Sequence, residues 1–287
     1  MKLVSYSQDQ SDFRAGVVVG DRVLDLNHAD AALPTDMVAL LANGEPALAR
    51  ARELSEAKQL ATISLAHVRL GSPIRRPEKI LGVGLNYRDH CVEMGRELPS
   101  AMRVFAMFDN GLIGHGGNII LPRSSTEMDY EAELVAVIGR NARNVTVKDA
   151  LSYVAGYTVG NDVSARDHQA DDPLTMRGKC GDTHAPIGPW IVTSDEVSDP
   201  TDLKIELRVN DRVLQSSNTS EMVFSVADIV SFVSQYYTLK PGDIIFTGTP
   251  AGVGYARNPP VWLQPGDKVD VTIEGIGTLT NTCVAEA

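Results

Sequence analysis

The sequence predicts a β-rich α+β protein in which a small α+β domain precedes a larger domain of mixed strands. Short runs of apolar and β-branched residues recur from about residue 80 to the end of the chain. Turns that contain glycine or proline separate many of these runs, as is typical of short strands. Strands and helices do not alternate regularly, which argues against a doubly wound parallel sheet.

The first part of the chain, residues 1–72, forms the predicted small domain. Two apolar runs within residues 13–26 flank Gly20-Asp21 and predict a hairpin around a two-residue turn. From Thr35 to about Leu65 the chain is rich in Ala, Leu and Glu with helical spacing. The remaining residues, 73–287, form the predicted second domain.

The second domain consists mainly of predicted strands, which share apolar, β-branched sequences bounded by turn residues. They are residues 80–84, 118–122, 128–138, 154–163, 190–193, 204–209 and 212–214. Ser225, with Asp228 three residues later, predicts the start of a helix that runs to about Tyr237. Pro-Gly-Asp sequences at 241–243 and 265–267 each precede a further strand.

Composition narrows the classes of partner. The formal net charge of −11 disfavours nucleic acid and anionic membranes, although a local basic pocket would still accept an anionic substrate. No signal peptide follows Met1, and no apolar run is long enough to span a bilayer. The three cysteines are widely spaced, which suggests neither disulfides nor a zinc site, so a reducing cytoplasm fits best.

Two glutamates two residues apart occur in the apolar run 128–138. Alternate residues of a strand point to the same face, so a strand here aims Glu131 and Glu133 at one point. Two buried carboxylates repel each other and lose hydration, and a hard divalent cation relieves both costs. The alternative is a sheet edge with two solvated acids, which the apolar residues on both faces argue against.

Three further residues suit such a site. Asp162 ends an apolar run, where it fits either a third oxygen ligand or the cap of a helix that starts near Ser164. On a helix, His90 and Glu93 would face each other, and the carboxylate would raise the basicity of the imidazole. The pair could take a proton from a water molecule, although spacing alone favours a casual surface contact.

Polar residues later in the chain fit an anionic substrate. Arg166 and Gln169 share a helix face, and arginine binds carboxylates through two parallel hydrogen bonds. Lys179 either supports an enolate or carboxylate or is a solvated loop residue. Thr249 lies in a glycine-rich turn that can hold a carboxylate or carbonyl. That turn lacks the P-loop lysine, and Gly82-Val83-Gly84 lacks the third glycine of a dinucleotide fingerprint, so no nucleotide is expected.

Taken in order along the chain, five stretches resemble the fumarylacetoacetate hydrolase family: residues 84–90, 128–138, 156–169, 178–193 and 242–254. The resemblance implies the family's mixed β-roll catalytic domain, usually as a homodimer. It implies Mg²⁺ or Mn²⁺ held by Glu131, Glu133 and Asp162, with Asp89 as a further ligand or a supporting group. It also implies catalytic roles for His90, Glu93 and Lys179, and substrate contacts from Arg166, Gln169 and Thr249.

Two departures from the family pattern concern the substrate. Met107 stands where many relatives carry the lysine of a Phe-x-Lys-Pro segment, and the proline is absent. Gly181 replaces the aromatic residue of the family's Lys-Ser-Phe-Asp-Thr sequence. We expect both changes to alter the shape and charge of the pocket.

The resemblance predicts a metal-dependent hydrolase that cleaves a carbon–carbon bond in a 1,3-dicarbonyl or acylpyruvate-type compound. The metal would hold an enolate while the His90–Glu93 dyad activates water. A 2-oxo diacid decarboxylase or a hydroxymuconate-type isomerase would use the same site. A catalytically inactive dimeric binding protein is the rival class, and the intact acids and dyad argue against it. Expected partners are a small anionic oxo-acid or diketone and a second copy of the chain, with no nucleic acid and no membrane.

Overall fold

The computed structural model of the chain describes residues 1–8, 12–57, 61–197 and 199–287. The strands, many of them short, are β1 Lys2–Ser7, β2 Arg14–Val19, β3 Arg22–Asp25, β4 Thr62–Ser64, β5 Arg69–Leu70, β6 Ile80–Gly84, β7 Arg103–Met107, β8 Leu112–Ile113, β9 Asn118–Leu121, β10 Met128–Asp129, β11 Ala132–Ile138, β12 Val154–Asn161, β13 Ser164–Ala165, β14 Ala185–Thr193, β15 Lys204–Val209, β16 Arg212–Asn218, β17 Ile244–Phe246, β18 Lys268–Ile273 and β19 Gly277–Ala285. The α-helices are α1 Leu26–Ala29, α2 Met37–Ala42, α3 Gly44–Glu56, α4 Arg88–Glu93, α5 Val147–Ala150, α6 Arg166–Ala170, α7 Met176–Lys179 and α8 Val226–Ser234. The predicted β-rich α+β class is confirmed.

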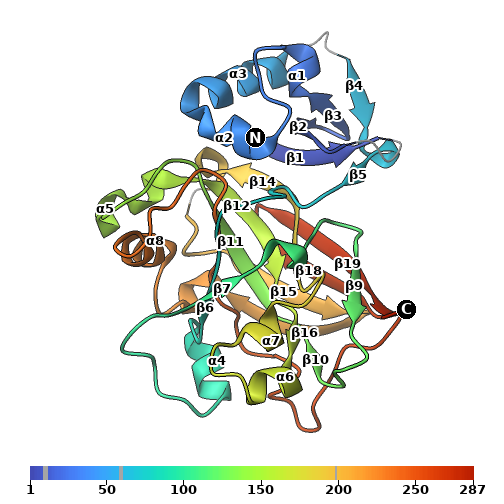
Figure 1. Cartoon of the computed structure of the whole chain (residues 1–287), viewed down its shortest axis with the longest axis vertical. Coiled ribbons are helices and arrows are strands. Elements are labelled where there is room, and N and C mark those ends of the chain that lie inside the picture. The colour runs from blue at the N-terminus through green and yellow to red at the C-terminus, as the bar shows by residue number, and fades with distance from the viewer. Residues whose placement is uncertain (9–11, 58–60, 198) are drawn as a thin grey trace.

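The N-terminal elements gather at one end of the molecule (Figure 1). The predicted hairpin is confirmed, since β2 and β3 pair antiparallel around the Gly20-Asp21 turn. The predicted helical stretch is too long, because α3 ends at Glu56 and β4 follows instead of more helix. Thr62-Ile63-Ser64 contains two β-branched residues and pairs with β3, so sheet pairing outweighs the helical pattern there. Residues 58–60 of that stretch lie outside the described residues.

A mixed sheet of twelve strands runs through the whole molecule. Its main path is β4-β3-β2-β1-β14-β12-β11-β17-β6-β7, so β1 joins the N-terminal strands to β14 of the second part of the chain. Most pairs are antiparallel, but β17 and β6 are parallel, as are β14 and β8. The division into domains 1–72 and 73–287 stays a prediction.

A second sheet, ordered β16-β15-β18-β19-β9, packs against the central strands β11, β12 and β14 of the first sheet. Apolar side chains from both sheets belong to one buried cluster, including Leu134, Val159, Leu207, Val271 and Leu279. Full burial of one such side chain stabilises the folded state by roughly 1.5–3 kcal/mol. This layered core fixes the positions of β11 and β12, from whose ends the polar site is built.

Helices cover one end and one flank of the second part (Figure 1). Helices α4, α6 and α7 lie at the end opposite the N-terminal elements, while α5 and α8 pack together on one flank. Ser225 and Asp228 form the predicted capping box of α8, which ends at Ser234 and not at Tyr237. The predicted strand 128–138 is divided into β10 and β11, with Tyr130-Glu131 between them.

Candidate active site and metal centre

Three carboxylates meet where two central strands end. Glu133 lies in β11, and Glu131 is the residue directly before that strand. Asp162 follows β12, which is the antiparallel neighbour of β11. One oxygen from each carboxylate lies within 4.8 Å of the others, and all three residues are buried. Glu131 therefore lies beside the strand and not within it, yet it reaches the same point as Glu133. This spacing suits a single cation with oxygen ligands.

Two buried cations accompany the acids. The Lys179 ammonium, at the end of α7, lies 2.6 Å from a Glu131 oxygen and 2.8 Å from an Asp162 oxygen. Arg166, at the start of α6, lies 2.6 Å from the other Glu131 oxygen and 2.9 Å from Asp129. Lys179 is only 4% exposed, so it is not a solvated loop residue.

The charges in this cluster do not balance without a further cation. Four buried carboxylates, the three above and Asp129, face two cations, which leaves two negative charges if every group is ionised. One oxygen of Asp162 is buried and has no hydrogen-bond partner in the described part of the chain. Buried charges are normally paired or metal-bound. The cluster therefore fits a divalent cation held by Glu131, Glu133 and Asp162.

The pKa values of the three acids reflect the same surplus of negative charge. Burial raises the pKa of Asp162 to about 6, against the opposing effect of Lys179. Burial and the neighbouring carboxylates of Asp162 and Glu131 raise the pKa of Glu133 well above its usual range. For Glu131, burial is outweighed by Lys179 and Arg166, so its pKa falls to about 2. Glu133 therefore tends to retain its proton until something else offsets its charge, and Asp162 takes up a proton as the pH falls through about 6.

The histidine–glutamate pair lies beside the acids. His90 Nδ1 is 3.0 Å from a Glu93 oxygen, and the other Glu93 oxygen accepts a hydrogen bond from the Gly252 amide at 2.8 Å. His90 is 7% exposed, so the pair is not a casual surface contact. Asp89 accepts from the His90 amide and the Ser217 hydroxyl and lies outside the acid group, which gives it a supporting position.

Most of these groups line one cavity of about 650 Å³, which we call the acid pocket. Of the residues predicted for the site, all but Asp89 and Glu93 line it: His90, Glu131, Glu133, Asp162, Arg166, Gln169, Lys179 and Thr249. Neither Met107 nor Gly181 does. Met107 is buried in an apolar cluster, and Gly181 packs against the His184 ring. The expectation that these two departures alter the shape and charge of the pocket stays a prediction.

Two residues that the sequence analysis missed hold the site in place. Asp129 accepts hydrogen bonds from Arg166 and from the Gly254 and Tyr255 amides, so it ties α6 to the glycine-rich turn. Gln215 accepts from the Ala132 amide and donates to the Thr249 hydroxyl at 2.8 Å. Both roles depend on contacts between distant segments, so no local pattern signals them. Asp129 lies in the apolar run 128–138 beside the two glutamates, but it forms no recognisable motif of its own.

A third missed residue, Arg103, lines the mouth of the acid pocket on β7. Within the described ranges, no carboxylate forms an ion pair with it, in contrast to Arg166 and Lys179. Leu85 and Thr175, which also line the pocket, adopt left-handed φ values of 55° and 66°. Such conformations are costly for residues other than glycine, and they cluster at functional sites. The lining of the acid pocket thus includes two strained backbone positions and an exposed arginine in addition to the buried acids.

The fold and the acid pocket define a β-rich protein with a buried site for a divalent cation. Residues 79–284 match the family model described as fumarylacetoacetate (FAA) hydrolase, C-terminal. The chain belongs to the fumarylacetoacetate hydrolase family.

Similar proteins carry several activities in their names. A rat protein named oxaloacetate tautomerase Fahd2a, mitochondrial, is 46% identical over 93% of this chain and 85% of its own length. A solved structure of a putative HpcE protein from Mycobacterium smegmatis has a TM-score of 0.90 at 35% identity, with full coverage of both chains. The maleylpyruvate hydrolase of Sphingobium sp. SYK-6, solved with manganese(II) and pyruvate, has a TM-score of 0.83 at 31% identity, also with full coverage of both.

These similarities support an enzyme with a divalent metal, and they leave open whether it is a hydrolase. No helix in the described ranges is long and apolar enough to cross a membrane. The name of the rat relative places that protein in mitochondria. The cytoplasmic location and the homodimer stay predictions.

Proposed function

We propose that this protein is a divalent-metal-dependent enzyme that shifts a proton between carbon and oxygen of a 2-oxo diacid, as in the keto–enol tautomerisation of oxaloacetate. The observation that carries the proposal is the position of His90. Its imidazole is buried, is held by Glu93, and opens on the same cavity as the three acids and Arg103. The name of the rat relative supports the same chemistry.

The chain offers a binding group for each end of such a substrate. Arg103 has no acid partner among the described residues and would take the distal carboxylate. Gln169 and Thr249 line the pocket and would orient the 2-oxo acid end. A divalent cation on Glu131, Glu133 and Asp162 would act as a Lewis acid on the 2-oxo group and offset the surplus negative charge.

Proton transfer then needs one base and no attacking water. His90 Nε2 would take the proton from the carbon next to the 2-oxo group, while Nδ1 remains hydrogen-bonded to Glu93. Glu93 stabilises the positively charged imidazolium and is itself anchored by the Gly252 amide. The Lys179 ammonium would stabilise negative charge on the enolate oxygen, and the His90 imidazolium would then give its proton to that oxygen to form the enol.

Hydrolysis of a carbon–carbon bond is the second candidate. It is favoured by the similarity to maleylpyruvate hydrolase, whose structure holds manganese(II) and pyruvate. In that reaction the same dyad would deprotonate a water molecule. Decarboxylation of a 2-oxo diacid would need no attacking water: the carbon–carboxylate bond would break to release CO₂, and the carbon that lost it would take up a proton. We propose that the bound cation is Mg²⁺ or Mn²⁺.

The test separates these reactions by their products. The metal-stripped protein would be given Mg²⁺ or Mn²⁺ and then the enol form of oxaloacetate in D₂O, with maleylpyruvate and an acylpyruvate in parallel. We expect ultraviolet absorbance to report faster ketonisation than with metal alone, and NMR to show deuterium at one carbon without fragmentation. Fragmentation of the acylpyruvate, without faster ketonisation, would replace the proposal by hydrolysis.

Substitutions of His90 and Glu93 test the role of this pair in proton transfer. His90→Asn should lower the turnover number about 10²- to 10⁴-fold, the usual contribution of a general base. Glu93→Gln should cause a smaller loss, because the base remains but its orientation and charge partner weaken. His168→Asn is the control, since His168 lies on α6 but does not line the pocket. Equal losses in all three variants would contradict a specific role for His90.

A further inference from the structure

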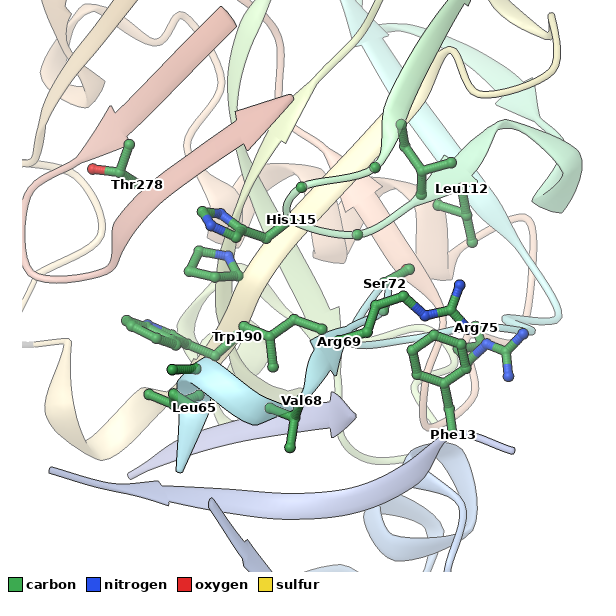
Figure 2. Close-up of a pocket in the computed structure, with 18 of the residues that line it drawn as sticks. Phe13, Leu65, Val68, Arg69, Ser72, Arg75, Leu112, His115, Trp190 and Thr278 are labelled. Carbon is green, nitrogen blue, oxygen red and sulfur yellow. The ribbon is translucent and has the colours of Figure 1, made fainter. Parts of the chain in front are cut away.

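A second cavity, of about 1020 Å³, lies where the N-terminal strands meet loops of the second part of the chain. We call it the junction cavity. It shares no lining residue with the acid pocket. Figure 2 shows Phe13 and Arg75 at one end and Trp190 and His115 at the other, with Arg69 between them. Its volume is at the upper end of the usual range for small-molecule sites, about 300–1,000 Å³.

Two arginines form the charged end of this cavity. The guanidinium carbons of Arg69 and Arg75 lie 4.6 and 4.2 Å from the centroid of the Phe13 ring. Neither arginine forms an ion pair with any carboxylate that the structure describes. Stacking on a ring holds a guanidinium in place but leaves its edge N–H groups available for hydrogen bonds. Two such groups converge on one end of the cavity.

The opposite end is apolar and rigid. Trp190 donates its indole N–H to the Ile276 carbonyl at 2.7 Å, and the Lys2 ammonium lies 4.6 Å from its ring centroid. Leu65, Val68 and Pro189 complete this wall. The fixed indole offers an aromatic surface for stacking, at little cost in side-chain entropy.

Close backbone approaches shape the cavity between these ends. A Cβ at Gly71 would meet the Phe13 ring at 2.4 Å, and a Cβ at Gly114 would meet the Gly71 backbone at 2.2 Å. Asn281, which is buried, donates to the carbonyls of Gly114 and Gly117 and fixes that loop. The walls are therefore held by tertiary contacts and not by a mobile surface loop.

The charge of the junction cavity is opposite in sign to that of the whole molecule. Among the described residues that line the cavity, Asp109 is the one carboxylate, against two arginines. Burial lowers the pKa of His115, so its imidazole is neutral at pH 7. The cavity therefore carries a net positive charge on a chain whose formal charge is −11.

We propose that the junction cavity binds an aromatic organic anion. Its carboxylate or sulfonate group would bind the N–H edges of Arg69 and Arg75, and its ring would stack on Trp190. The site is independent of the acid pocket and of the function proposed for it.

Anilinonaphthalene sulfonate is a suitable probe, because it is an aromatic anion whose emission is sensitised by nearby tryptophan. The chain has two tryptophans, Trp190 and Trp262, so the Trp262→Phe variant leaves Trp190 as the sole donor. We expect saturable energy transfer to the probe in that variant and little in Trp190→Phe. In the Trp262→Phe background, replacing both Arg69 and Arg75 by Gln should weaken binding about tenfold or more, the equivalent of one or two charge-assisted hydrogen bonds.

The matched control is Arg76→Gln, because Arg76 is the exposed neighbour of Arg75 and does not line the cavity. Phenylnaphthylamine, the uncharged analogue, should bind at least about tenfold more weakly than the sulfonate. Circular dichroism would check that each variant is folded, and the single variant Arg75→Gln replaces the double one if the latter is not. Energy transfer that is absent, or that is unchanged by the arginine substitutions, would overturn the proposal.

Discussion

The acid pocket and the junction cavity both contain cationic side chains, but these have different partners. In the acid pocket Lys179 and Arg166 are surrounded by a larger number of buried carboxylates. In the junction cavity Arg69 and Arg75 stack on the Phe13 ring, and Asp109 is the one acid in the part of the lining that the structure describes. The first site therefore has surplus negative charge and the second has surplus positive charge.

The difference shows that ligand class follows the charge balance of a cavity and not the number of its arginines and lysines. A site with surplus carboxylates must take up a metal cation or protons before it can bind an anion. A site with cations stacked on a ring can bind an anion directly. Substitutions and pH changes that alter the charge balance of either cavity test this contrast.

The largest expected effect comes from removing one carboxylate of the acid pocket. Glu131→Ala changes the balance from four acids against two cations to three against two. We expect loss of measurable metal binding by calorimetry and a fall in metal-dependent turnover of about a thousandfold, equivalent to several kcal/mol. Binding of anilinonaphthalene sulfonate to the junction cavity should be unchanged.

His184→Gln is the control for this change, because His184 is buried nearby but lies outside the acid group. It should retain the metal affinity of the unaltered protein. Full activity of the unaltered protein in excess chelator would show that the metal is not required.

The next effect is a difference in pH dependence between the two cavities. Burial raises the pKa of Asp162 to about 6 and raises the pKa of Glu133 well above its usual range, so both carboxylates bind protons as the pH falls. Only the ionised carboxylates bind a metal, so metal affinity should rise from pH 5 to pH 7 by about tenfold or more. Calorimetry at several pH values measures this directly.

Binding in the junction cavity should change little over the same range, because arginine stays charged. A metal affinity that is equally flat would mean that the acids are already ionised in the folded protein. That result would contradict the charge balance inferred for the acid pocket.

The smallest expected effect concerns Arg103, the cation of the acid pocket that most resembles the junction arginines. Replacing Arg103 by Gln should raise the KM for a 2-oxo diacid about tenfold, the loss of one charge-assisted hydrogen bond, with kcat nearly unchanged. Arg96→Gln, on the same exposed segment but outside the pocket lining, should leave KM unaltered. Steady-state kinetics with a diacid and a monoacid give the comparison, and an equal rise for both substrates would exclude recognition of the distal carboxylate.

Much of the site was predictable because its residues occur in local patterns. The Glu-x-Glu run, the acid after a buried strand and the i,i+3 histidine–glutamate pair each follow from backbone periodicity. The hairpin around Gly20-Asp21 and the capping box at Ser225 were predictable for the same reason. The helical pattern failed after Glu56, where pairing of β4 with β3 decided the conformation.

By itself the sequence determined which residue types and local elements this protein has, since turn chemistry, capping and side-chain periodicity act over a few residues. Tertiary structure alone decided which charges meet. Asp129 reaches Arg166, and Gln215 reaches Thr249, across segments far apart in the chain. The junction cavity likewise combines Phe13, Arg69 and Trp190, which only the packing of the sheets brings together. Long-range contacts leave no short-range pattern, because they depend on how complete strands and loops pack.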